Sequence, residues 1–158
     1  ERGISMALGM SPVDAPRLDP TGSGPAADES YAVWARLAAE ALDEFDALYV
    51  HLKGPDVPAH DGRAQDKRDV IAAIDRTFFG EVLGLLDTTR TLIAVTGDHS
   101  TSCLRAAHTA DPVPLLVSGG PVQADGSDSF GERACAKGSL GELLGPQILP
   151  RLAELIRP

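Results

Sequence analysis

The sequence lacks the features of nucleic-acid-binding, membrane-spanning and disulfide-rich proteins. Its 158 residues carry a net charge of −9, so the broad basic surface that binds nucleic acid is not expected. No apolar run approaches the roughly 18 to 20 residues that cross a bilayer, and the first residues do not resemble a signal peptide. The two cysteines, Cys103 and Cys135, lack CxxC spacing and form no disulfide framework. We therefore expect a cytoplasmic protein with neither nucleic-acid nor membrane partners.

Apolar spacing predicts alternating helices and strands. Residues 1–29 are rich in Pro, Gly, Ser and Asp and are expected to form a loop, after which Ser30 is a candidate helix cap. Helical spacing recurs over residues 30–45, 63–86 and 140–156. Short apolar runs predict strands at residues 46–53, 91–97 and 113–120. Pro146 and Pro150 are candidate breaks in the last helix.

This order predicts an α/β fold. Helices and strands alternate with short connections, which favours a mostly parallel sheet flanked by helices. We predict a single domain over residues 1–158. In the second helix, one buried stripe is expected to contain Ile71, Ile74, Phe78, Val82 and Leu85.

Metal-binding side chains follow the predicted strands. Asp56 and His60 come after the first strand, Asp98 and His99 come after the second, and His108 precedes the third. In open parallel sheets, ligands bind beyond the carboxyl ends of the strands. We therefore expect these side chains to gather at one edge of the sheet.

Imidazole and carboxylate groups together suit Mn²⁺ or Zn²⁺, and the oxygen ligands favour Mn²⁺ or Mg²⁺. A cation there would polarise a phosphoryl oxygen and lower the pKa of a bound hydroxyl. A lone Asp–His pair is more often a surface turn, and Pro58 favours a loop over a helix between Asp56 and His60. The prediction therefore depends on three separate loops that all carry Asp or His.

Several neighbouring residues leave two interpretations open. Lys53 is either a solvated strand end or a contact for a phosphate group. His51, inside a predicted strand, has a structural role or supports the ligands, and Cys103 has a similar role. Asp61 can simply begin the next helix, where a negative charge is favourable.

Four segments, in this order, resemble the C-terminal part of the cofactor-independent (2,3-bisphosphoglycerate-independent) phosphoglycerate mutases of archaeal type. They are "VHLKGPDVPAHDG", "VTGDHSTSC", "HTADPVPLLVSGG" and "FGERACAKGSLGELLGPQILP". That family belongs to the alkaline phosphatase superfamily. The resemblance implies an alkaline-phosphatase-like fold of which this chain is the C-terminal half.

The resemblance further implies a glycolytic isomerase with two divalent metal ions, usually manganese. Such an enzyme interconverts 3-phosphoglycerate and 2-phosphoglycerate through a phosphoserine. One ion would be bound by the residues that match Asp56, His60 and His108. The pair that matches Asp98 and His99 would supply part of the second site. The partner would be a phosphorylated small molecule.

The sequence departs from the family at the nucleophile. In the family, the nucleophilic Ser and a further metal-binding Asp come from an N-terminal segment, and no serine here has that context. We expect a fragment that is inactive alone and that needs the missing N-terminal segment or a second copy of itself. A phosphohydrolase or phosphonate-pathway enzyme of the same superfamily, and a non-catalytic metal-binding module, are the alternatives.

Overall fold

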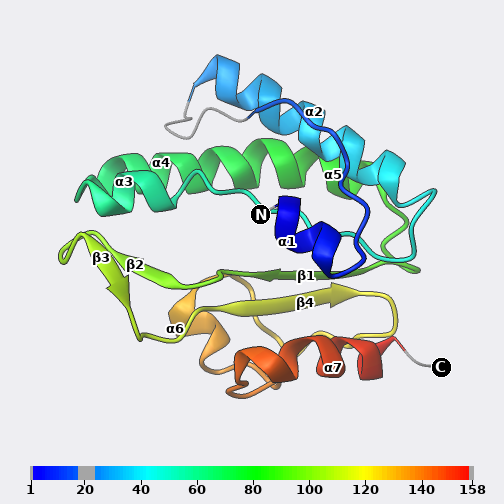
Figure 1. Ribbon diagram of the computed structural model, residues 1–158. Coiled ribbons are helices and arrows are strands. Elements are labelled where there is room, and N and C mark those ends of the chain that lie inside the picture. The colour runs from blue at the N-terminus through cyan, green and yellow to red at the C-terminus, as the bar shows by residue number, and fades with distance from the viewer. Residues whose placement is uncertain (1, 18–23, 157–158) are drawn as a thin grey trace. The chain divides into compact units, whose positions relative to one another are not determined.

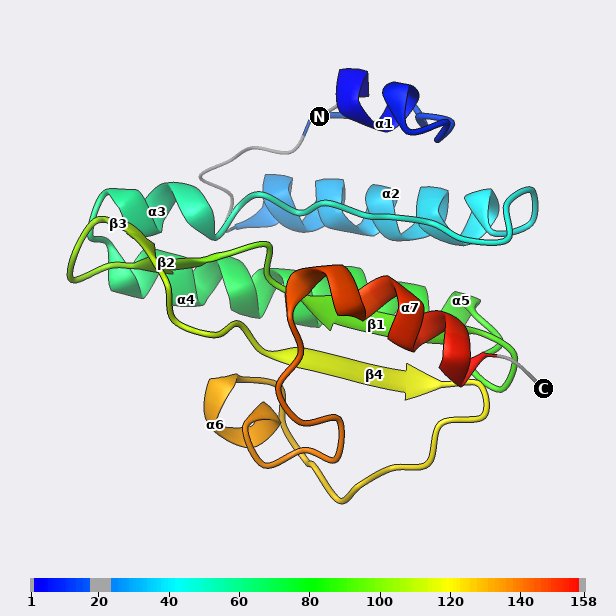
Figure 2. The same cartoon turned by 60° about the horizontal axis from the view of Figure 1, so that its bottom comes forward.

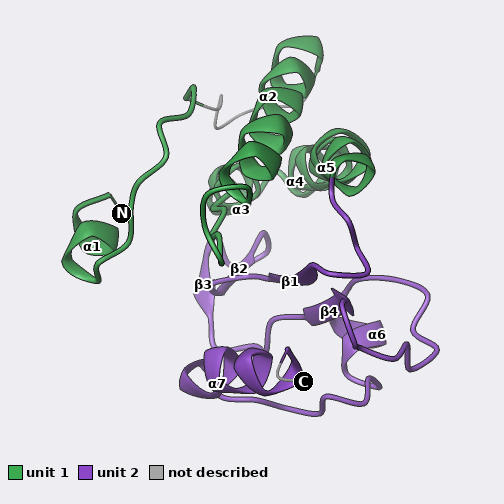
Figure 3. Cartoon of the chain, turned by 90° about the vertical axis from the view of Figure 1, so that its right-hand side faces the viewer, with its two compact units in different colours: residues 1–85 green, residues 86–158 purple. Residues whose placement is uncertain are grey.

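Figure 1 shows a computed structural model of the chain, which describes residues 2–17 and 24–156. Contacts within the chain divide it into two units, residues 1–85 and residues 86–158, shown in green and purple in Figure 3. Within the described ranges, no helix combines the length and the apolar character that crossing a membrane requires. Residues 18–23, which belong to the predicted N-terminal loop, lie outside the described residues.

The first unit is helical. Its elements are α1 (Arg2–Ala7), α2 (Pro25–Ala41), α3 (Asp56–His60), α4 (Ala64–Ala73), η1 (Ile74–Phe79) and α5 (Gly80–Leu85). The last three follow one another without a break and form one long rod. Figures 1 and 2 both show α2 beside this rod. The predicted helix over 63–86 is therefore confirmed, and the one over 30–45 is confirmed as far as Ala41, where α2 ends.

Small side chains on α2 let the two helices approach closely. The buried residues of α2 lie on one stripe, Ala27, Tyr31, Ala35, Ala38 and Ala41. The rod contributes the larger buried side chains, Val70, Ile74, Phe78 and Val82. Alanines facing branched and aromatic groups allow the layers to interdigitate at high packing density.

The segment η1 is a π-helix, and it changes which residues of the rod are buried. In an α-helix, a step of four residues overshoots a full turn by about 40°. A π-helix has more residues per turn, so the same step overshoots less. Steps of four residues, from Val70 to Ile74, Phe78 and Val82, therefore stay on the buried face. The predicted stripe is wrong at Ile71, which is 47% exposed, and at Leu85, which is 51% exposed.

Two further predictions for this unit need correction. Part of the predicted N-terminal loop is helical: α1 lies there, and α2 begins at Pro25, whose fixed φ suits a helix start. Ser30 therefore lies inside α2, where its hydroxyl donates to the carbonyl of Ala26. Residues 46–53 belong to no strand and connect α2 with α3. Their apolar run is not packed as a strand would be, since Tyr49 is 68% exposed.

The second unit contains the strands. Its elements are β1 (Leu92–Thr96), β2 (Ser100–Ser102), β3 (Ala107–Thr109), β4 (Leu115–Gly119), α6 (Glu132–Cys135) and α7 (Gly145–Leu155). Strand β1 pairs with β4, and β2 pairs with β3 in a short hairpin. The predicted strands over 91–97 and 113–120 are confirmed, and so is the closing helix.

The mostly parallel sheet that the sequence predicts is not confirmed, because both ladders among the described residues are antiparallel. A parallel pair needs a crossover that carries the chain back to the start of the first strand. Here the connection after β1 is the β2–β3 hairpin, which returns the chain to the edge where β1 ended. Thr96 at the end of β1 therefore pairs with Leu115 at the start of β4.

Gly119 closes the other end of this ladder, opposite Leu92. Its φ is +85°, in the left-handed region that glycine adopts without strain. A Cβ atom at this position would lie 2.2 Å from the carbonyl oxygen of Thr91. Both the backbone conformation and the close approach therefore require glycine here.

The C-terminal part is held by side-chain acceptors. The carboxylate of Asp125 accepts from the backbone N–H of Ser127 at 3.1 Å and from that of Ser139 at 2.7 Å. These bonds lower the pKa of Asp125 below its ordinary value.

Helix α7 runs unbroken through Pro150, so the predicted break is wrong there. Pro146 lies in the first turn of this helix, where proline fits.

Candidate metal centre

Asp56 and His60 lie on one short helix of the first unit. Helix α3 is a single turn, so side chains four residues apart share one face. His60 Nε2 lies 3.4 Å from Asp56 Oδ1, and both side chains are partly exposed to solvent. The prediction of a loop here was wrong because Pro58 lies in the first turn, where its missing N–H costs no helical hydrogen bond.

The opposite face of α3 anchors it. Pro58 and Ala59 are fully buried, which leaves Asp56 and His60 on the outer face. Just before the helix, a Cβ atom on Gly54 would lie 2.8 Å from Val70 Cγ1 and 2.9 Å from the Tyr31 hydroxyl oxygen. Glycine at this position lets the segment lie against the buried stripe of its own unit and so fixes where α3 begins.

Lys53 lies on the segment that leads into α3. Its side chain is exposed, and its carbonyl accepts from the backbone N–H of Asp56 at 3.3 Å. The residue therefore belongs to the same local structure as Asp56. A role in binding phosphate remains a prediction.

Asp98, His99 and His108 lie together in the second unit. His99 Nε2 is 3.4 Å from Asp98 Oδ2. The imidazole rings of His99 and His108 stack with centroids 3.8 Å apart and an interplanar angle of 32°. The antiparallel ladder explains this proximity, because the end of β1 and the start of β4 share one edge, and residues 97–114 lie there.

Thr101 supports this group, although no sequence motif singled it out. Its hydroxyl oxygen lies 3.1 Å from His99 Nδ1, and the residue is only 5% exposed. In the hairpin it is the direct partner of His108. A hydroxyl two residues after a candidate ligand at the start of a strand is the signal that would have found it, since such residues share a face.

The donor set fits a divalent cation. Asp56 and His60 form one carboxylate–imidazole pair, and Asp98 and His99 form another, with His108 stacked on the second pair. Both pairs are partly exposed, so a cation can reach them. Nitrogen and carboxylate oxygen without thiolate suit Mn²⁺ and Zn²⁺. His51, by contrast, makes a tilted ring contact with Tyr49, centroids 6.3 Å apart, which fits a structural role.

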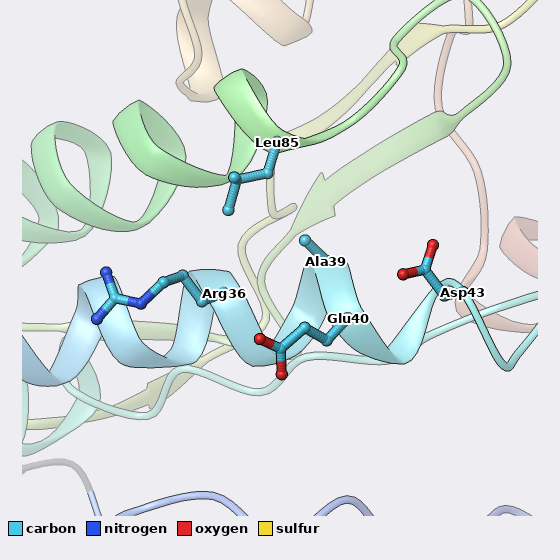
Figure 4. A pocket seen from close by; sticks show the side chains of 5 residues that line it. All are labelled: Arg36, Ala39, Glu40, Asp43 and Leu85. Atoms are coloured by element: carbon cyan, nitrogen blue, oxygen red, sulfur yellow. The ribbon is translucent and has the colours of Figure 1, made fainter.

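A pocket elsewhere in the first unit does not resemble a metal or phosphate site. Figure 4 shows Arg36 and Glu40 on α2, Asp43 in the turn that follows α2, and Leu85 on α5. The guanidinium of Arg36 already donates to Glu81 at 3.0 Å. The pocket carries neither histidine nor a basic group without a carboxylate partner, so the chemistry predicted from the sequence does not belong there.

Comparison with known proteins identifies relatives over almost the whole chain. A family model described as the metalloenzyme superfamily matches residues 21–152. The 2,3-bisphosphoglycerate-independent phosphoglycerate mutase of Thermococcus kodakarensis is 34% identical over 98% of this chain and 36% of its own length. The enzyme of that name from Aeropyrum pernix is 38% identical over 99% of this chain and 36% of its own length.

A solved structure agrees with these matches. A protein from Pyrococcus horikoshii superposes with a TM-score of 0.88 at 33% identity, covering 98% of this chain and 45% of that one. The chain thus spans 36% of the length of the curated relatives it matches.

Proposed function

Because this chain belongs to the metalloenzyme superfamily, we propose that it is the metal-binding part of a phosphoglycerate mutase that depends on divalent cations. The main support is the grouping of Asp98, His99 and His108 where β1 ends, since these are three of the five side chains that the sequence motifs single out. Relatives that carry the mutase name match the chain almost from end to end. We further propose that residues 1–158 act as one domain in the cytoplasm.

Two cations are proposed, with Mn²⁺ the favoured ion. Asp56, His60 and His108 would bind the first, while Asp98 and His99 would bind the second. The 3.8 Å stacking of His99 and His108 supports this division, because adjacent imidazoles can each offer a nitrogen to a different ion. Two-metal sites for phosphoryl transfer hold their ions about 3.5–4 Å apart.

The cations, when bound, would supply the electrophilic chemistry by neutralising charge on a transferring phosphoryl group. The residues of this chain hold and orient the ions. Lys53, three residues before Asp56, is proposed to contact the phosphate of the substrate as a point charge. We propose that the nucleophilic serine and a further carboxylate ligand come from residues outside this sequence, so the 158 residues alone would be inactive.

The test is an assay of the natural protein that carries this sequence, with Mn²⁺ and 3-phosphoglycerate, followed by detection of 2-phosphoglycerate. Conversion that disappears on chelation and returns with Mn²⁺ is expected. Release of inorganic phosphate without isomerisation would indicate a phosphohydrolase instead. A folded, metal-loaded protein with neither activity would reject the enzyme assignment and favour a metal-binding module.

A further inference from the structure

We propose that Thr101 is a positioning residue that fixes the imidazole of His99 so that its Nε2 faces the cation. The inference rests on the proposed function, because that assigns His99 to a metal. Thr101 was not among the predicted ligands. Its effect on the cation would pass through the ring of His99, whose Nδ1 it contacts.

Two contacts restrain the ring of His99 from different sides. The hydroxyl oxygen of Thr101 lies 3.1 Å from Nδ1, which restricts rotation within the ring plane. The ring of His108 lies 3.8 Å away, centroid to centroid, and restricts tilting of that plane. With both in place, Nε2 is left on the side of Asp98 Oδ2, 3.4 Å away. The carboxylate and the imidazole nitrogen that would share one cation are thus already side by side.

The β2–β3 hairpin makes this arrangement rigid. Thr101 and His108 are direct cross-strand partners, so their side chains share one face of the ladder. His99, two residues before Thr101, is placed next to that face. The register of this short ladder therefore places Thr101 opposite His108, and His99 directly precedes its first strand.

A hydroxyl suits this role better than other groups of its size. It accepts a hydrogen bond from Nδ1–H when Nε2 binds a metal, and it donates a hydrogen bond to Nδ1 when Nε2 carries the proton. The contact can thus persist with and without the cation. Partners that hold the second nitrogen of a metal-binding histidine contribute about 10–100-fold to metal affinity.

Packing alone does not explain a threonine here. The residue is 5% exposed, and valine would fill the same space in a strand without the cost of burying a hydroxyl. A buried hydroxyl is stabilised only when it is hydrogen-bonded, and His99 Nδ1 is within that distance. The contact with His99 therefore gives the buried hydroxyl a partner that valine could not provide.

The experiment compares variants of the 158-residue chain, with ¹⁵N-labelled histidine, by long-range ¹H–¹⁵N NMR, and His99→Gln assigns the resonances. Thr101→Val removes the hydroxyl and keeps the shape, whereas Thr101→Ser keeps the hydroxyl. Thr89→Val is the matched control, since it loses a comparable hydroxyl bond, 2.6 Å to Asp87, before β1 begins. Each chain is recorded without metal and then titrated with Zn²⁺.

We expect Thr101→Val to shift the Nδ1 resonance of His99 in the metal-free chain. The Zn²⁺ concentration that half-saturates the His99 signal should rise by about tenfold or more. Thr101→Ser and Thr89→Val should leave both quantities unchanged. A folded Thr101→Val with an unaltered Nδ1 resonance and unaltered Zn²⁺ response would overturn the proposal, as would a Thr101→Ser that behaves like valine.

Two controls keep the outcomes separate. If Thr101→Val does not fold, Thr101→Ser and Thr101→Ala make the same comparison, because both lack the methyl group and only serine keeps the hydroxyl. A wild-type His99 signal that ignores Zn²⁺ would count against the proposed cation site. The Nδ1 resonance without metal would still decide whether Thr101 holds the ring.

Discussion

At the scale of single residues, the two described glycines with the closest neighbours occupy positions where a Cβ atom would clash. Gly54 lies against Val70 and Tyr31 just before α3, and Gly119 lies against the carbonyl of Thr91 where β4 ends. Neither binds anything. They fix the ends of the elements from which the candidate ligands extend.

Gly119→Ala should destabilise the fold strongly. The new Cβ would lie 2.2 Å from a backbone oxygen, and the φ of +85° adds roughly 1–2 kcal/mol of strain. We expect a total loss of more than about 2 kcal/mol in the free energy of unfolding, measured by denaturant titration. Gly126→Ala is the matched control, because Gly126 has the same φ with nothing within 4 Å, so it should show the strain alone.

Replacing a candidate ligand should lower the metal affinity, whereas replacing His51 should mainly affect stability. His60→Ala and His108→Ala each remove one of three proposed ligands from one cation. The fall in Mn²⁺ affinity, measured by calorimetry, should therefore exceed the ~10–100-fold typical of a lost supporting partner. His51→Ala should change stability more than affinity. Unchanged Mn²⁺ binding in both ligand variants would refute the assignment of the first cation.

At the scale of elements, short connections determine where the functional side chains lie. The β2–β3 hairpin returns the chain to the edge where β1 ends, and a single helical turn presents Asp56 and His60 together. Farther along the chain, the carboxylate of Asp125 joins the two ends of the segment around α6 through the N–H groups of Ser127 and Ser139. The β2–β3 hairpin, the single turn of α3 and the short helix α6 are each too short to be stable in isolation, so contacts with the rest of the fold must hold them.

The Asp125 link should weaken in acid. Its hydrogen bonds lower the pKa of the folded state below the ordinary 3.8, so the unfolded state takes up a proton first as the pH falls. The contribution to stability is therefore complete above about pH 5 and is lost progressively as the pH falls below the ordinary value. Amide exchange at Ser139, followed by NMR, should accelerate over that range.

The same measurement has a mutational control. Asp125→Ala should accelerate exchange at Ser139 at neutral pH, because both acceptor oxygens are gone. Asp128→Ala removes a nearby carboxylate that accepts only from the Ser129 hydroxyl in the described contacts, and it should leave Ser139 unaffected. Exchange at Ser139 that stays slow in Asp125→Ala would show that the carboxylate does not hold the segment.

At the scale of the whole molecule, the net negative charge favours the accumulation of cations around the chain. The net charge of −9 raises the local concentration of divalent ions around the chain. The metalloenzyme-superfamily model matches residues 21–152, a range that includes both groups of candidate ligands. Binding that occurs only in the folded state must then add to stability.

Mn²⁺ should raise the melting temperature of the 158-residue chain. Saturation at about 100 times the dissociation constant would add about 2.7 kcal/mol, and a chelator should reverse the shift. Calorimetric or fluorescence melting with and without Mn²⁺ measures this. His99→Ala combined with His108→Ala should abolish most of the shift, while Mn²⁺ that still stabilises this double variant equally would place its site elsewhere.

The sequence by itself determined the helices α2 and α4, the strands β1 and β4, and the identity of five candidate ligands, because periodicity and motif spacing are local properties of the chain. Only the tertiary structure decided the antiparallel pairing, the π turn in the rod, the helical form of residues 56–60 and the position of Thr101 against His99. Each of these depends on which distant segment supplies a hydrogen-bond partner or a packing surface, and local sequence carries little information about that choice.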